Sequence, residues 1–83
     1  MQAALTREQG QEFVIVLVKD YVVHDSGARA EMINFAEREF GVRAALITER
    51  SLRTFGPTDI VRWLEGIAIE QLPWAEYTFS PVS

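Results

Sequence analysis

The feature that most constrains the fold of this chain is its longest apolar run, Phe13-Val14-Ile15-Val16-Leu17-Val18. Most of these residues are β-branched, and such residues favour an extended strand over a helix. The run does not alternate between apolar and polar side chains, so both faces of the strand need cover. We therefore expect a central strand, which Tyr21-Val22-Val23 continues. Lys19-Asp20 between them marks a bulge, the exit of the strand from the core or a tight turn, and the turn is the least favoured because neither Gly nor Asn stands there.

The size of the chain leaves room for one domain. It has 83 residues, of which 48% are apolar and 24% are charged, as in ordinary globular proteins. This composition argues against a disordered or fibrous chain. We place a single α/β domain at residues 12–80, preceded by an N-terminal arm or short helical turn at residues 1–11 and followed by a tail at residues 81–83. Thr6 and Gln9 have the spacing of a capping box, which is the reason to consider a helical turn.

Two segments have the periodicity of amphipathic helices. From about Ala28 to Phe40 the apolar residues fall on one face, and Gly41 stands where a helix ends in the left-handed conformation. Gly56-Pro57-Thr58-Asp59 is typical of a helix start, and the apolar side chains after it share a face. Three further strands are expected, at residues 42–48, 52–55 and 74–80. The side chains expected in the core are those of Ile15, Leu17, Ile33, Ala36, Phe40, Leu46, Ile60, Leu64 and Ile67.

These elements follow one another in the order β-α-β-(β)-α-β. A right-handed crossover makes the first two strands parallel, either adjacent or one strand apart. The order predicts an α+β fold, a two-layer α/β sandwich of the ferredoxin-like split βαβ type, with both helices on one face of the sheet. If residues 52–55 form a loop, the alternative is a small doubly wound sheet of three strands.

The charge balance argues against a nucleic-acid partner. Eight Lys+Arg and twelve Asp+Glu give a net charge of −4 and a pI near 4.8, whereas nucleic-acid binders are usually basic. Arg43, Arg50 and Arg53 flank the second expected strand. Acidic residues close to them in the sequence are expected to pair with them in a solvated rim.

Several kinds of chemistry lack the residues that they need. The chain has no Cys and one His, which leaves no thiolate nucleophile, no disulfide and too few ligands for a metal site. Neither the G-x-G-x-x-G nor the G-x-x-x-x-G-K-[ST] motif of nucleotide-binding loops occurs. We therefore expect no cofactor, no metal and no catalytic residue, which favours a non-enzymatic protein. The apolar runs are too short to span a membrane and the first residues do not form a signal peptide, so we expect a soluble, cytoplasmic protein.

The best candidate site is the loop before the first helix, His24-Asp25-Ser26-Gly27, together with Arg29. Ligands of open α/β sheets gather at the carboxyl ends of the strands, and a helix N-terminus offers N–H groups to an anion. Arg29 falls on the apolar side of its helix, where a charge needs a partner. Asp20 or Asp25 would supply one within the chain, and a carboxylate or phosphate ligand is the alternative. The loop also suits a plain helix cap, with Asp25 or Ser26 as the capping residue.

A second candidate is a protein interface. If both helices cover one face of the sheet, Val14, Val16 and Val18 are bare on the other, and such an apolar patch is seldom left in water. Trp74, at the entrance of the last strand, is the candidate anchor. We therefore expect a homodimer, and the expected function is that of a small self-associating protein–protein interaction module. The alternative is a small-ligand or anion-binding domain, an enzyme included, that uses the loop at residues 24–29.

Overall fold

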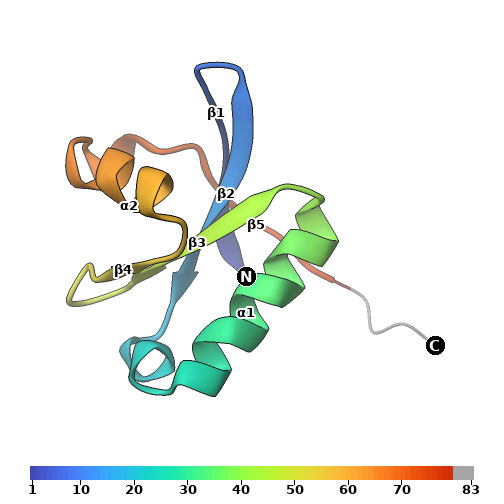
Figure 1. The fold of residues 1–83 in the computed structure, drawn as a ribbon, viewed down its shortest axis with the longest axis vertical. Helices are drawn as coiled ribbons and strands as arrows, with labels where there is room; N and C mark the ends of the chain where they lie inside the picture. Colours follow the sequence, from blue (N-terminus) through green and yellow to red (C-terminus); the bar gives the residue numbers. More distant parts are fainter. Residues whose placement is uncertain (80–83) are drawn as a thin grey trace.

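A computed structural model describes residues 1–79 of the chain. Five strands and two α-helices follow one another in the order ββαββαβ, with two short 3-10 helices between them (Figure 1). The elements are β1 (Gln2–Glu8), β2 (Gln11–Val18), η1 (Asp20–His24), α1 (Ser26–Phe40), β3 (Arg43–Thr48), β4 (Thr54–Phe55), α2 (Thr58–Glu65), η2 (Ile69–Gln71) and β5 (Trp74–Glu76). The tail expected at residues 81–83, and Ser80 at the end of the last expected strand, lie outside the described residues.

The strands form one mixed sheet in the order β4-β3-β2-β1-β5. β2 and β3 are parallel neighbours, with Val14 opposite Ala44, and α1 connects them. β4 joins β3 and β5 joins β1 in antiparallel pairs, so these two short strands form the edges. The α+β class and the parallel pairing of the first two expected strands are thus confirmed. A five-stranded sheet in this order is not a clear ferredoxin-like split βαβ, nor is it the three-stranded alternative.

The prediction of an arm or helical turn at residues 1–11 is wrong. β1 pairs along its length with β2 in an antiparallel hairpin. Its turn consists of Gln9 with φ 51° and Gly10 with φ 78°, and the two-residue hairpin turn of type I′ requires positive φ at both positions. The Thr6 hydroxyl donates to the carbonyl of Ala4, so the spacing of Thr6 and Gln9 does not signal a capping box.

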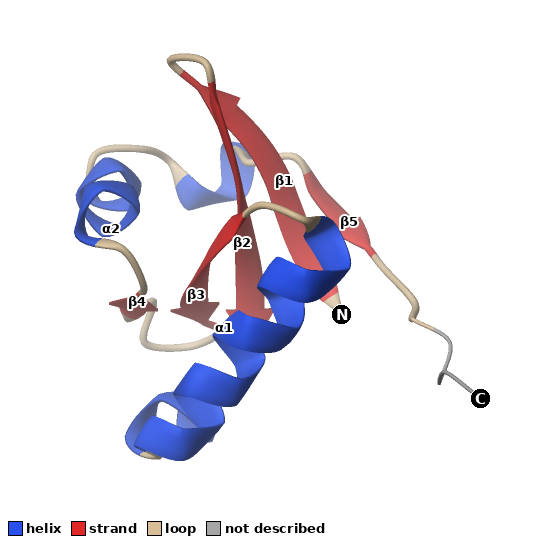
Figure 2. Cartoon of the chain, turned by 45° about the vertical axis from the view of Figure 1, so that its right-hand side comes forward, coloured by secondary structure: helices blue, strands red, loops and turns tan. Residues whose placement is uncertain are grey.

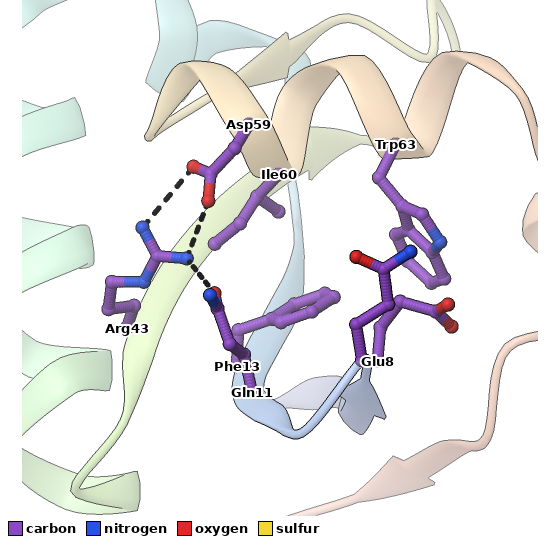
Figure 3. A pocket seen from close by; sticks show the side chains of 8 residues that line it. Glu8, Gln11, Phe13, Arg43, Asp59, Ile60 and Trp63 are labelled. Atoms are coloured by element: carbon purple, nitrogen blue, oxygen red, sulfur yellow. Dashed lines mark hydrogen bonds and ion pairs between the residues drawn. The ribbon is translucent and has the colours of Figure 1, made fainter.

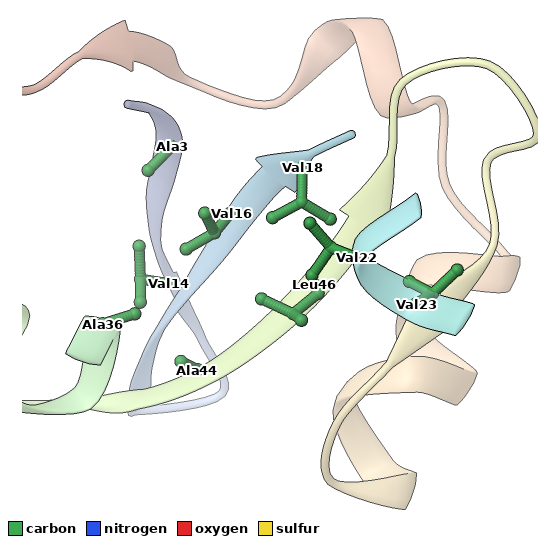
Figure 4. Close-up of a cluster of buried hydrophobic side chains, with 9 residues drawn as sticks. All are labelled: Ala3, Val14, Val16, Val18, Val22, Val23, Ala36, Ala44 and Leu46. Atoms are coloured by element: carbon green, nitrogen blue, oxygen red, sulfur yellow. The ribbon is translucent and has the colours of Figure 1, made fainter. Parts of the chain in front are cut away.

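The two helices cover opposite faces of the sheet (Figure 2). On one face, Val14, Val16 and Val18 pack with Leu46 of β3 and Ala36 of α1 (Figure 4). On the other face, the alternate residues of the same strands pack against α2. β2 is therefore buried on both sides, as its unbroken apolar run predicts.

This arrangement removes the reason for expecting an interface at Val14, Val16 and Val18. Their exposed fractions are 0%, 1% and 5% within a single chain, because α1 covers the face on which they lie. The two-layer arrangement with both helices on one face is wrong, and the bare patch that it implied does not exist. The homodimer stays a prediction, but these valines no longer provide its surface.

β2 ends at Val18, although the apolar residues beyond it predicted a longer strand. Lys19 leads into η1, and the N–H of Val22 donates to the carbonyl of Lys19 over 3.0 Å. Val22 and Val23 are buried in the same core as the valines of β2. Lys19-Asp20 is therefore the exit of the strand, and the β-branched residues after it serve the core without extending the sheet.

α1 is the element that the sequence predicts most closely. It begins after the capping residue Asp25 and ends at Phe40, and Gly41 follows in the left-handed conformation with φ 69°. α2 is shorter than its apolar pattern predicts, because it ends at Glu65 and leaves Ile67 outside the helix. Of the expected core, Ile15, Ala36, Leu46, Ile60 and Leu64 are buried, while Leu17, Ile33, Phe40 and Ile67 are half-buried.

Candidate functional site

The loop between η1 and α1 acts as a helix cap. Asp25 is the N-cap of α1, and its Oδ1 accepts hydrogen bonds from the N–H groups of Gly27 over 2.9 Å and Ala28 over 3.3 Å. Such a cap satisfies N–H groups that have no partner within the helix. His24 at the end of η1 and Ser26 at the start of α1 are both exposed. The N–H groups that were candidates for holding an anion are therefore already bonded to Asp25.

The side chain of Arg29 contacts two elements outside its own helix. Its Nη1 donates to the backbone carbonyl of Val23, and its Cζ lies 4.6 Å from the ring centroid of Phe55 in β4. Arg29 as a residue is half-buried, and its guanidinium is stabilised by a carbonyl dipole and by the negative face of an aromatic ring. The expected ion pair with Asp20 or Asp25 is wrong, because both carboxylates bind backbone N–H groups.

A second guanidinium lies near the same ring. The Cζ of Arg53 is 5.9 Å from the Phe55 centroid, and we refer to Arg29, Arg53 and Phe55 as the arginine–phenylalanine cluster. Within residues 1–79, ion pairs join the Met1 terminus to Glu76, Arg7 to Glu12, Lys19 to Glu49 and Arg43 to Asp59. Neither arginine of the cluster takes part in one. Two positive charges therefore lie near one aromatic ring, and neither forms an ion pair with a carboxylate of residues 1–79.

Hydrogen bonds to the backbone hold the loop between β3 and β4, which carries Arg53. The Asp20 carboxylate accepts from the N–H groups of Arg50 over 3.0 Å and Ser51 over 3.2 Å. The Thr48 hydroxyl accepts from the N–H of Arg53 over 2.8 Å. Hydrogen bonds from the Arg50 N–H and then the Ser51 side chain lower the pKa of the Asp20 carboxyl, because they favour its charged form. The position of Arg53 is thereby tied to both η1 and β3.

The sequence identifies Arg29 but not the other two members of the cluster. It predicts Arg53 in a salt-bridged rim and assigns Phe55 no role beyond a short strand. The signal that was available is the alternation of side chains along a strand, which puts Arg53 and Phe55 on the same face. That signal becomes useful only once the pairing of β4 with β3 is known.

A pocket of about 160 Å³ lies at the opposite end of β2, beside the hairpin turn (Figure 3). There the guanidinium of Arg43 donates to both carboxylate oxygens of Asp59, over 3.2 and 2.7 Å, and to Oε1 of Gln11 over 2.9 Å. The pairing raises the pKa of Arg43 and lowers the pKa of the Asp59 carboxyl. Phe13 and Trp63 meet edge to face below it, with centroids 5.2 Å apart. Arg43 thus already has an anion from its own chain, unlike the arginines of the cluster.

Trp74, the expected interface anchor, is half-buried at the start of β5. Its indole N–H donates to the carbonyl of Ile69 over 2.8 Å, and its ring packs against the core on the α2 side. The ring is therefore used in part by the fold. Its role in an interface stays a prediction.

Two further observations concern the described part of the chain. Among residues 1–79, no three side chains of the metal-ligating types come together in a group that would hold a metal ion. Neither helix in that range combines the length and the apolar composition that crossing a membrane requires.

Comparisons with known protein families, with curated proteins and with solved structures found no match to this chain. What the chain does has to be inferred from the geometry of its sites.

Proposed function

We propose that this chain is a protein-interaction module that recognises an acidic group of a partner protein at the arginine–phenylalanine cluster. The observation that carries the proposal is the placement of Arg29 and Arg53 at 4.6 and 5.9 Å from one ring centroid. Neither has a carboxylate partner among residues 1–79. The cluster lies at the carboxyl end of β2 and β3, the end at which ligands of open α/β sheets gather.

Electrostatics favour an anion at this place. Two positive charges that lie near the same ring repel each other, and an anion beside them relieves that repulsion. Arg29 uses one donor on Val23, and a guanidinium has five N–H donors in a geometry that matches a carboxylate. The chain as a whole carries a net charge of −4. The cluster is therefore a local positive region on an acidic protein, which directs an anionic group to one position.

This proposal draws on both functions that the sequence predicts. It keeps the protein partner of the interaction module. It takes its site from the anion-binding alternative at residues 24–29, with Arg53 and Phe55 added and the capped N–H groups left out. Self-association stays a separate prediction, which light scattering of the purified protein would measure.

A titration of the ¹⁵N-labelled protein with glutarate at low salt tests the proposal, because this dicarboxylate mimics acidic side chains. The signals of Arg29, Arg53 and Phe55 should shift and saturate in the millimolar range. Replacing both arginines by methionine keeps their bulk and removes their charge. The double variant should bind glutarate at least about tenfold more weakly, since a hydrogen bond to a charged group contributes roughly 1.5–3 kcal/mol.

The matched control is the double variant Arg7→Met with Arg38→Met, which removes the same charge at two exposed positions outside the cluster. It should change the affinity for glutarate by less than about twofold, because exposed charges at a distance are screened. The proposal is wrong if glutarate leaves the cluster signals unchanged. It is equally wrong if the control variant weakens binding as much as the cluster variant does.

A further inference from the structure

We propose that the acidic group recognised by the cluster belongs to an extended segment of the partner, which adds as a strand to the outer edge of β4. This inference rests on the proposed function and specifies its partner. The added strand would carry acidic side chains on the α1 face of the sheet and apolar side chains on the α2 face. Three features of β4 lead to it: a free edge, the cluster on one face and a partly apolar hollow on the other.

The outer edge of β4 presents backbone groups that the sheet does not use. β4 is the last strand on its side of the sheet. The N–H of Thr48 donates to the carbonyl of Arg53 over 3.0 Å, so the backbone of Arg53 faces β3. The N–H and C=O groups of successive strand residues point to opposite sides of the strand. The backbone of Phe55 therefore also faces β3, and the N–H and C=O of Thr54 face outward. An extended peptide pairs with outward groups of this kind.

The α1 face of β4 favours an acidic residue in the added strand. Arg53 and Phe55 project to this face, where Phe55 packs against the core beneath α1 and Arg29 lies over its ring. Neighbouring strands lie about 4.8 Å apart. A residue paired beside Phe55 therefore brings an Asp or Glu side chain within reach of both guanidinium groups.

The α2 face beside β4 favours an apolar residue. A hollow of about 500 Å³ lies there. Ile47, Leu64 and Ile69 form its apolar part, and Arg53 and Thr54 also line it. Glu65 also lines this hollow, and its carboxylate repels a second acidic group. Side chains of successive strand residues point to opposite faces. The partner segment should therefore alternate acidic and apolar residues.

Leu52 adds an apolar contact at the same edge. Its side chain is 54% exposed, lines the hollow, and belongs to a residue with φ 54°. A branched residue seldom adopts this left-handed conformation, and where one does, a binding site is often close. An apolar side chain of the partner in the hollow would cover Leu52.

A second copy of this chain fits the edge less well than an acidic segment does. If the β4 strands of two copies paired antiparallel, each Arg53 would lie on the same face as the cluster of the other copy. The positive charge would double without an acid to balance it, and like charges across a strand pair are destabilising. The charge pattern therefore favours a partner of different, acidic sequence.

The probe for this inference is a short peptide of alternating glutamate and valine, added to the full chain. The first control peptide has the same composition in two blocks. Two more keep the alternation but carry N-methyl groups, either on every glutamate or on every valine, so that one edge of the peptide can no longer pair. The alternating peptide should bind at least about tenfold more tightly than the block peptide and than one of the methylated peptides. The Thr54 amide should become protected from hydrogen exchange.

A substitution in the protein provides the matching test. Thr54→Pro removes the outward N–H but breaks no hydrogen bond to β3. An edge strand tolerates proline at a position whose N–H faces outward. This variant should weaken the alternating peptide about tenfold and leave glutarate binding unchanged, whereas Thr54→Ala, which keeps the N–H, should preserve both. Retention of peptide binding by Thr54→Pro overturns the edge pairing.

The remaining outcomes separate this inference from the proposed function. Equal binding of all the peptides, with glutarate still bound at the cluster, overturns the added strand and leaves the function intact. If neither glutarate nor any peptide binds, both fail. The protein alone could also form a dimer that Thr54→Pro dissociates. That result would assign the edge to a second copy of the chain and overturn the proposal of an acidic partner segment.

Discussion

Gly56 shows how strongly one residue limits the path of this chain. It connects β4 to α2 with φ 146°, in a region that only glycine readily adopts. A Cβ at this position would lie 2.8 Å from the Cβ and 2.9 Å from the Cα of Ala45 in β3. Ala45 is completely buried, so it cannot yield without a shift of β3 itself. At Gly56 the backbone passes so close to β3 that there is no space for a side chain at this position.

Gly56→Ala should therefore lower the free energy of unfolding by about 2–4 kcal/mol, through backbone strain and steric overlap together. Urea denaturation followed by circular dichroism measures the loss. Gly66→Ala is the matched control, because Gly66 has φ −104° and a Cβ there would meet nothing nearer than the Trp63 carbonyl oxygen at 3.8 Å. The control should be neutral or slightly stabilising. An equal loss in the two variants would contradict the steric explanation.

Among the residues of the cluster, Arg29 is the one that its place in the sequence singles out. It falls on the apolar side of an amphipathic helix, and a charge in that position needs a partner. The identity of the partner cannot be read from spacing, because Phe55 comes near only through the pairing of β4 with β3. The nearer acids, Asp20 and Asp25, bind backbone N–H groups instead. That use competes with ion pairing, and for Asp20 it involves the backbone of Arg50, 30 residues further along the chain.

At the scale of elements, α1 and β1 show why one segment is predictable and another is not. α1 has a regular apolar face, the capping Asp25 and the terminal Gly41, and all three agree. The buried residues of β1 are only Ala3 and Ala4, and its turn lacks the Asn-Gly or Asp-Gly that signals a hairpin. Pairing with β2 and β5 on its two sides makes β1 a strand. This is a tertiary effect that local propensity does not report.

The loop between β3 and β4 should lose stability in acid, because the Asp20 carboxylate that holds it has a lowered pKa. Such a group stabilises the fold fully above its unfolded pKa, about 3.9 for Asp. That contribution is lost as the pH falls through the lower pKa of the folded state. Asp20→Asn keeps the shape of the side chain without its charge. The variant should be less stable than the parent at neutral pH, and the two stabilities should converge below about pH 4.

Urea denaturation at several pH values measures that convergence. Hydrogen exchange gives a local reading, since the amides of Arg50 and Ser51 donate to Asp20 and should lose protection in the variant at neutral pH. A difference in stability that stays constant down to about pH 3 would show that the charge of Asp20 contributes nothing.

At the scale of the whole molecule, one sheet separates two apolar cores. Val14 belongs to the core beneath α1 and Ile15 to the core beneath α2, so both cores are built on the same strand. Neither can loosen without disturbing β2, and we expect them to unfold as one unit. Trp63 and Trp74 both pack against the α2 side, whereas the longer helix α1 lies on the other. Tryptophan fluorescence and far-UV circular dichroism therefore report mainly on different sides of the sheet.

Leu64→Ala tests this coupling. The Leu64 side chain is 2% exposed in the α2-side core, and its truncation should cost about 2–5 kcal/mol. The urea midpoints from fluorescence and from circular dichroism should fall by the same amount. Val16→Ala is the reciprocal variant, since it truncates a residue on the α1 side and should still move the tryptophan signal. A shift confined to one probe would show that the cores unfold separately.

The pairing of β5 with β1 also determines the order in which the sheet can be completed during synthesis. Gln2 lies opposite Glu76 and Ala4 opposite Trp74. β1, the first of the five strands to be made, therefore waits for β5, the last of them. The hairpin of β1 and β2 and the unit of β2, α1 and β3 use local contacts and can form early. Until residues 74–76 leave the ribosome, the outer edge of β1 has no partner, and an unpaired strand edge is where unfinished chains associate. A chain that pauses shortly before Trp74 carries nearly the whole core together with an open edge. That unfinished chain, and not the completed protein, is the species most exposed to misassociation.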